Sequence, residues 1–186
     1  VYFCTGQNSR KGIGAKIMAV DISTWSVKWE YVMPKTVIKN TYSEELICAG
    51  GNSSNIVIHG EKIVFPGDGL ICFNKNTGEK LWSSLAPFDC SFEDGTTSVE
   101  SELYFDEKSE RIYYSGVRGD FGKINVIEPS EENLFCIDIN TGKKIWGRGT
   151  GFCEGGKPKI FNGILYLPSN RKMMAVNPEN GNIIGG

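Results

Sequence analysis

Short runs of alternating apolar and polar residues recur along the chain, and turn-forming residues separate them. Residues 55–60, 62–65 and 111–114 are examples of such runs. Alternation with a period of two predicts half-buried β-strands, and the intervening glycine, asparagine and aspartate residues predict tight turns. The pattern therefore indicates an all-β chain built from antiparallel hairpins.

One pattern of eleven positions occurs four times in these hairpins. It reads small residue, any residue, Asp or Asn, three residues, Gly, three residues, Trp. The copies at residues 72–82 and 136–146 fill every defined position. The copy at 19–29 has Trp25 in place of the glycine, and the copy at 175–185 has Gly185 in place of the tryptophan. Such weakened copies are usual at the ends of a repeat array.

The chemistry of the pattern explains its residue types. The Asp or Asn starts a turn, because its side chain can accept a hydrogen bond from the backbone two residues on. Glycine at positions 78, 142 and 181 supplies the positive φ that such turns often need. A further strand pair precedes each of the last three hairpins, so each repeat predicts a four-stranded antiparallel meander. We expect these units at residues 1–31, 54–84, 101–149 and 157–186, with one strand missing from the first.

Four-stranded units that repeat at this spacing are typical of β-propeller blades. The eleven-position pattern resembles the pyrroloquinoline-quinone-type (PQQ-like) propeller repeat, which also occurs in the outer-membrane assembly lipoprotein family. The resemblance covers nearly the whole chain and implies about four blades of a larger ring, with the missing blades supplied by the rest of the chain or by another copy. In that family the small residue and the tryptophan pack between adjacent blades. The residues to which it assigns blade docking are Trp29, Trp82, Trp146, Gly78, Gly142, Gly181, Cys72 and Cys136.

The six cysteines change this picture little. Cys72 and Cys136 occupy the position that alanine fills in the other two copies, so we expect them to act as small apolar packing residues. Cys48, Cys90 and Cys153 remain, and they could form a disulfide or stay unpaired loop thiols. A zinc site is not expected, because the chain has a single histidine and no close Cys-x-x-Cys pair.

Three long connections are candidate binding segments, because long loops on a rigid scaffold often carry binding. They span residues 32–53, 85–101 and 118–132. The third contains Arg118-Gly119-Asp120, an integrin ligand in some extracellular proteins, which in this chain is equally compatible with a solvated loop.

The chain carries 20 basic and 22 acidic residues, well mixed, which gives no electrostatic footprint for nucleic acid. No apolar run approaches the roughly 20 residues that cross a bilayer. These observations favour a non-catalytic propeller that binds or scaffolds a protein partner, with no cofactor. The resemblance further implies a periplasmic, cell-envelope or extracellular location.

Two alternatives stay open. One is a fragment of a PQQ- and calcium-dependent quinoprotein dehydrogenase. Enzymes of the resembled family typically bind PQQ beside two adjacent cysteines, and no Cys-Cys dipeptide occurs in this chain. The other is a ligand- or carbohydrate-binding domain of a surface protein. Because the repeat assigns the other tryptophans to packing, Trp25 is the candidate contact residue in that case.

Overall fold

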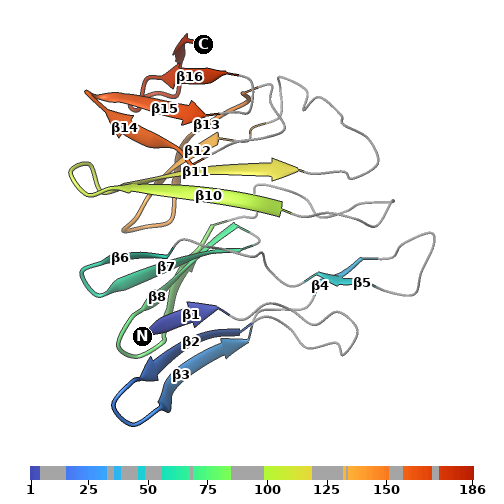
Figure 1. The fold of residues 1–186 in the computed structure, drawn as a ribbon, viewed down its shortest axis with the longest axis vertical. Helices are drawn as coiled ribbons and strands as arrows, with labels where there is room; N and C mark the ends of the chain where they lie inside the picture. The colour runs from blue at the N-terminus through green and yellow to red at the C-terminus, as the bar shows by residue number, and fades with distance from the viewer. Residues whose placement is uncertain are drawn as a thin grey trace. The chain divides into compact units, whose positions relative to one another are not determined.

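The computed structural model describes residues 1–4, 16–32, 36–38, 46–48, 56–67, 69–84, 99–118, 132, 134–150, 157–168 and 172–186. Every regular element in these ranges is a β-strand, and the strands form antiparallel sheets (Figure 1). The chain divides into two compact units, Val1–Thr97 and Ser98–Gly186, which are described separately. We call the four larger sheets blades 1 to 4, in chain order.

The first unit contains blades 1 and 2. Blade 1 has three described strands in the order β1-β2-β3, and blade 2 has four in the order β6-β7-β8-β9. The strands of blade 1 are β1 (Tyr2–Cys4), β2 (Lys16–Asp21) and β3 (Ser26–Val32). Those of blade 2 are β6 (Val57–His59), β7 (Lys62–Gly67), β8 (Gly69–Asn74) and β9 (Lys80–Ser83).

The connection at residues 32–53, expected to be a long loop, contains a short hairpin. Strands β4 (Thr36–Ile38) and β5 (Leu46–Cys48) pair antiparallel, with Val37 opposite Ile47. Each strand has three residues, which is too few for the alternating pattern to distinguish it from a loop. The hairpin is therefore an addition to the meander that the repeat did not predict.

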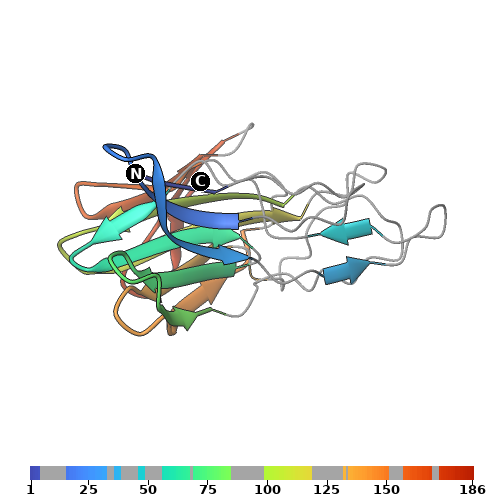
Figure 2. The same ribbon diagram turned by 90° about the horizontal axis from the view of Figure 1, so that it is seen from below.

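The second unit contains blades 3 and 4, each a four-stranded meander in chain order. The strands of blade 3 are β10 (Val99–Asp106), β11 (Arg111–Arg118), β12 (Leu134–Asp138) and β13 (Lys144–Arg148). Those of blade 4 are β14 (Lys159–Phe161), β15 (Ile164–Pro168), β16 (Met173–Val176) and β17 (Ile183–Gly185). The predicted all-β class is thus confirmed, and Figure 2 shows the twist of these strands from a second direction.

The turn chemistry predicted from the repeat is present in all four copies. In each copy the Asp or Asn side chain accepts a hydrogen bond of 2.9 Å from the backbone amide two residues on. The accepting side chains are those of Asp21, Asn74, Asp138 and Asn177. Gly78, Gly142 and Gly181 have φ values of 76°, 69° and 73°. Trp25, at the same position of the first copy, keeps this left-handed conformation with a φ of 56°.

A β-bulge follows the small residue in every copy. Cys72 lies opposite Trp82, but the next residue, Phe73, lies opposite Lys80, so Leu81 is the extra residue. The same shift follows Ala19, Cys136 and Ala175. The small residue and the tryptophan are therefore cross-strand neighbours within one blade, while the bulged residue points to the other side of the outer strand.

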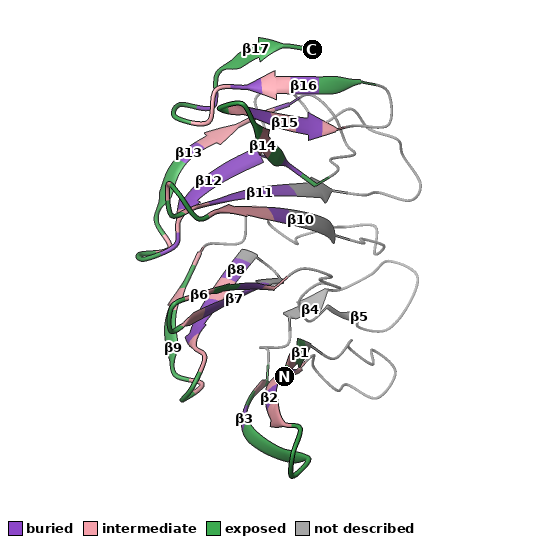
Figure 3. Cartoon of the chain, turned by 60° about the vertical axis from the view of Figure 1, so that its left-hand side comes forward, coloured by how far each residue is buried: buried purple, intermediate pink, exposed green. Residues whose placement is uncertain are grey.

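Each unit has its own apolar core between two blades. In the first unit, Ile17, Ala19 and Trp29 of blade 1 pack with Ile63, Phe65 and Phe73 of blade 2. In the second, a cluster joins blades 3 and 4 through Tyr113, Leu134, Cys136, Trp146, Leu165, Leu167, Met174 and Val176. Figure 3 shows that the inner strands β8 and β12 are largely buried, whereas the outer strands β3, β9 and β17 are largely exposed.

Candidate functional site

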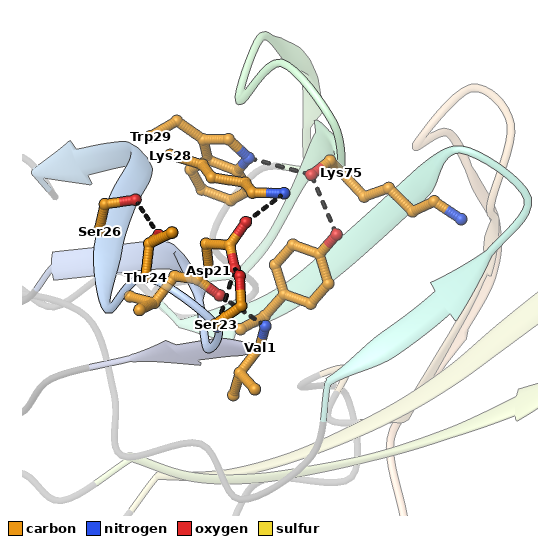
Figure 4. Close-up of polar contacts among 10 residues, drawn as sticks. Val1, Asp21, Ser23, Thr24, Ser26, Lys28, Trp29 and Lys75 are labelled. Atoms are coloured by element: carbon orange, nitrogen blue, oxygen red, sulfur yellow. Dashed lines mark hydrogen bonds and ion pairs between the residues drawn. The ribbon is translucent and has the colours of Figure 1, made fainter.

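The tryptophan of blade 1 packs into the turn of blade 2. Trp29 is buried, and its indole Nε1 donates a hydrogen bond of 3.0 Å to the backbone carbonyl of Lys75 (Figure 4). The Tyr2 hydroxyl donates to the same carbonyl at 3.1 Å. A Cβ atom on Gly78 would lie 2.6 Å from Cγ of Trp29, so the ring needs glycine beneath it. We call this arrangement of indole, carbonyl and glycine a tryptophan dock.

The second unit repeats this dock between blades 3 and 4. Nε1 of Trp146 donates to the carbonyl of Pro178 at 2.9 Å, and the Tyr113 hydroxyl donates to the same oxygen at 3.4 Å. A Cβ atom on Gly181 would lie 2.6 Å from Cε3 of Trp146. Lys75 and Pro178 both directly follow the turn Asp or Asn of their repeats. The contact is thus a property of the repeat.

Sequence reasoning identified the tryptophans and glycines but missed the other members of the dock. The acceptor is a backbone carbonyl, which no side-chain pattern marks. Tyr2 and Tyr113 lie opposite the small residue of their repeats in the structure. The distance in sequence between tyrosine and small residue varies with the intervening loop, so no fixed spacing reveals them.

Two residues assigned by the resemblance have a place in the structure without a printed dock. Trp82 lies on β9, is half-buried, and faces Cys72 across the sheet. Gly142 forms the turn between β12 and β13, where its amide donates to the carbonyl of Asp138. Their role in blade docking stays a prediction.

The two repeat cysteines are free, fully buried thiols. Burial raises the pKa of Cys72 to about 11 and that of Cys136 to about 12. Both are therefore protonated at neutral pH, whereas nucleophilic and metal-binding cysteines act as thiolates. Cys90, Cys153 and the side chain of Cys48 lie outside the described residues, so the disulfide prediction stays open.

The turn between β2 and β3 differs from the docks because it exposes its aromatic residue. The Trp25 side chain is 80% exposed, and the neighbouring Ile22 and Val27 are exposed as well. A left-handed conformation costs a bulky residue about 1–3 kcal/mol, and it persists only where the surroundings enforce it. We call these three residues the Trp25 patch.

Polar contacts around Asp21 hold this turn in place (Figure 4). Its carboxylate accepts hydrogen bonds from the amide and hydroxyl of Ser23 and forms an ion pair of 3.3 Å with Lys28. The hydroxyl hydrogen bond from Ser23 is the largest cause that lowers the pKa of Asp21 to about 2. The Thr24 and Ser26 hydroxyls are 2.7 Å apart across the turn. The turn is therefore a well-connected support for an exposed indole.

Other candidate features contribute less. The described ranges contain no group of three His, Cys, Asp or Glu side chains arranged to hold a metal ion. Nor do they contain a helix that could span a membrane. Arg118 is the last residue of β11, and the rest of its tripeptide lies outside the described residues, as do residues 85–98 of the second long connection.

Comparison with known proteins finds likeness in structure only. No family model matches the sequence, and no curated protein matches it. Among solved structures, a europium-containing methanol dehydrogenase matches with a TM-score of 0.55 at 14% identity, over 91% of this chain and 37% of that chain. A quinohemoprotein alcohol dehydrogenase from Pseudomonas putida matches with a TM-score of 0.50 at 9% identity, over 90% of this chain and 34% of that chain.

BamB from Moraxella catarrhalis also matches, at 15% identity over 91% of this chain and 57% of that chain, but its TM-score of 0.42 carries no argument. The chain spans about a third of the length of the two dehydrogenases. At these identities the likeness concerns the fold and not the activity. The chain therefore has the β-propeller fold of quinoprotein type.

Proposed function

We propose that this chain is a non-catalytic propeller segment that binds a protein partner. The observation that carries the proposal is the Trp25 patch, in which a largely exposed indole stands on a turn held by the contacts of Asp21. Exposed tryptophans on rigid supports are frequent anchors of protein interfaces, because they bury much apolar area at little entropic cost.

The docks support the same reading by accounting for two of the other tryptophans. Trp29 and Trp146 are buried against the next blade and cannot present their faces to a ligand. We propose that they join blades together with Gly78 and Gly181. Trp82 and Gly142, at the same positions of their repeats, belong to this proposal, as do the blade ranges 1–31, 54–84, 101–149 and 157–186. An extracytoplasmic location also belongs to it, because repeats of the resembled family are commonly exported.

A carbohydrate would be the alternative ligand for Trp25, since sugars stack on exposed aromatic rings. The composition of the patch favours protein over sugar. Ile22 and Val27, its other members, offer apolar surface without the hydrogen-bonding side chains that orient a sugar. A protein interface instead surrounds its aromatic anchor with apolar contacts.

The described residues do not fit a PQQ site of the resembled kind. Cys72 and Cys136 lie in different sheets, each opposite a repeat tryptophan, so they cannot form the adjacent pair found beside that cofactor. Their raised pKa values also keep them as neutral thiols. We therefore derive no reaction step through the quinone.

The test is to add PQQ and Ca²⁺ to the purified chain and record the quinone absorbance, followed by dye-linked oxidation of short alcohols. We expect no stoichiometric binding and no oxidation. Saturable binding at one quinone per chain together with alcohol-dependent dye reduction would replace the proposal with the enzyme. For the patch, Trp25→Ala should leave the melting temperature unchanged. A marked drop in melting temperature would show that Trp25 is structural instead.

A further inference from the structure

The docks give every blade two different faces. One face presents the tryptophan and the small residue, and in blade 3 it also contains Leu134. The other face receives them, and in blade 4 its members, Leu165, Leu167, Met174 and Val176, are at most 3% exposed. We call these the presenting face and the receiving face.

Blade 1 has a receiving face that nothing covers within the described residues. Strand register matches Phe3 with Leu167 and Met18 with Met174, because each pair flanks the small residue of its repeat in the same way. The other equivalents are Val1 and Val20, so all four positions are apolar. Yet Val1 is 64% exposed and Phe3 39%, whereas the matching residues of blade 4 are buried. This face has the composition of a core and the exposure of a surface.

Blade 4 has the complementary presenting face. Met173 matches Leu134, which is fully buried, but Met173 is 53% exposed. Tyr166 lies opposite the small residue Ala175, as Tyr113 lies opposite Cys136. The hydroxyl of Tyr113 donates to the carbonyl of the next blade's turn. Tyr166 is therefore positioned to donate to the turn of a following blade.

The two uncovered faces also exchange their dock residues. Blade 4 has Gly185 at the tryptophan position, and blade 1 has Trp25 at the glycine position. In the observed docks, a Cβ on the turn glycine points into the tryptophan ring at 2.6 Å. Trp25 shares the positive φ of those glycines, so its Cβ points toward the same place. Gly185 leaves that place empty, so this pairing again offers one indole and one glycine.

We propose that blade 1 of one copy docks on blade 4 of a second copy, with the indole of Trp25 over Gly185. The inference rests on the proposed binding role of the Trp25 patch and names its partner. A blade with the regular pattern would bring a second tryptophan into collision with Trp25. A second copy of this chain supplies the glycine, the tyrosine and the apolar face together. The contact is head-to-tail, so each copy can use both of its faces.

The test measures self-association of the 186-residue chain by sedimentation velocity across a range of concentrations. Trp25→Gly should weaken association about tenfold or more by removing the anchor, and Gly185→Trp should do so by causing a collision. The double variant W25G/G185W should restore association, because it recreates the regular dock. Both changes are compatible with folding, since glycine tolerates the φ of position 25 and a Cβ at 185 meets only Ala175 Cβ at 3.8 Å.

Leu81→Glu is the matched control, because Leu81 is an exposed apolar bulge residue on an outer strand and belongs to neither face. It should leave association unchanged. A chain that stays monomeric at about 100 μM, or a double variant as weak as the singles, would overturn the proposal. The readout is molecular mass, whereas the proposed function is tested by quinone absorbance and alcohol oxidation. Either can therefore fail without the other.

Discussion

The two tryptophan docks share their centre and differ in their surroundings. In the first unit, aromatic rings surround Trp29: its centroid lies 5.8 Å from that of Phe73, which in turn lies 4.9 Å from Tyr31. In the second unit, arginines surround Trp146. Arg111 donates to the Glu179 carboxylate at 2.7 Å. A second arginine, Arg148, donates to the carbonyl of Gly181 at 2.9 Å and to the Asn182 side chain at 2.8 Å.

This difference separates what the repeat requires from what it tolerates. The indole, the turn carbonyl and the glycine occur in both units because the turn geometry creates all three at once. The surrounding residues lie outside the pattern, so one unit uses ring packing and the other uses charge and hydrogen bonds. The docks should therefore respond alike to changes at their centre and differently to changes at their periphery.

The largest expected effect comes from removing the indole. Trp29→Ala and Trp146→Ala should each lower the free energy of unfolding by about 3–5 kcal/mol, as for other buried aromatic residues. Urea denaturation measures the change. Trp146→Phe is the control, because it keeps a ring and loses only the hydrogen bond to Pro178, worth about 1 kcal/mol. Strongly unequal losses in the two alanine variants would contradict a shared centre.

The next effect is at the glycine under the ring. Gly78→Ala and Gly181→Ala should each destabilise by about 2–4 kcal/mol, because the methyl group overlaps the indole and the backbone is left-handed. Gly60→Ala and Gly163→Ala are matched controls. Their φ values are also positive, but nothing lies within 4 Å of the added Cβ, so only the conformational cost of about 1 kcal/mol should remain. Equal losses at all four positions would show that the overlap is relieved.

The peripheral arginines should give smaller, unit-specific effects. Arg148→Ala removes hydrogen bonds to Gly181 and Asn182 and should cost about 1–2 kcal/mol. Arg111→Ala breaks an ion pair whose acidic partner is largely exposed, so it should cost about 0.2–1 kcal/mol. Unfolding in low and high salt checks the assignment. The loss from Arg111→Ala should shrink in high salt, and an unchanged loss would argue against a charge effect.

The smallest effect is the pH response of the first turn. The folded pKa of Asp21 is about 2, below its ordinary value near 4, because the ionised carboxylate is hydrogen-bonded by Ser23. Its contribution to stability is therefore complete above pH about 4 and is lost as the pH falls through about 2. An NMR titration of the carboxyl carbon measures this directly, and Asp21→Asn should remove the dependence. A midpoint near 4 would mean that the Ser23 contacts do not form in solution.

The local chemistry of this chain was accessible to sequence reasoning. The turns opened by Asp21, Asn74, Asp138 and Asn177 follow from side-chain hydrogen bonds that span two residues. The prediction that the position of Trp25 requires a positive φ follows in the same way, because three other copies place glycine there. The packing role expected for Cys72 and Cys136 agrees with their complete burial. The β4–β5 hairpin could not be recognised, since its strands are too short to show a period.

The sequence by itself determined the strands, the turns and the cross-strand pairing of small residue with tryptophan, because all of these arise within one hairpin. Only the tertiary structure decided which carbonyl receives each indole, since Trp29 reaches Lys75 and Trp146 reaches Pro178 in another sheet. It also decided that Val1, Phe3 and Met173 are exposed although their equivalents are buried. Burial depends on whether a second sheet covers a face, and a pattern within one strand contains no record of that sheet.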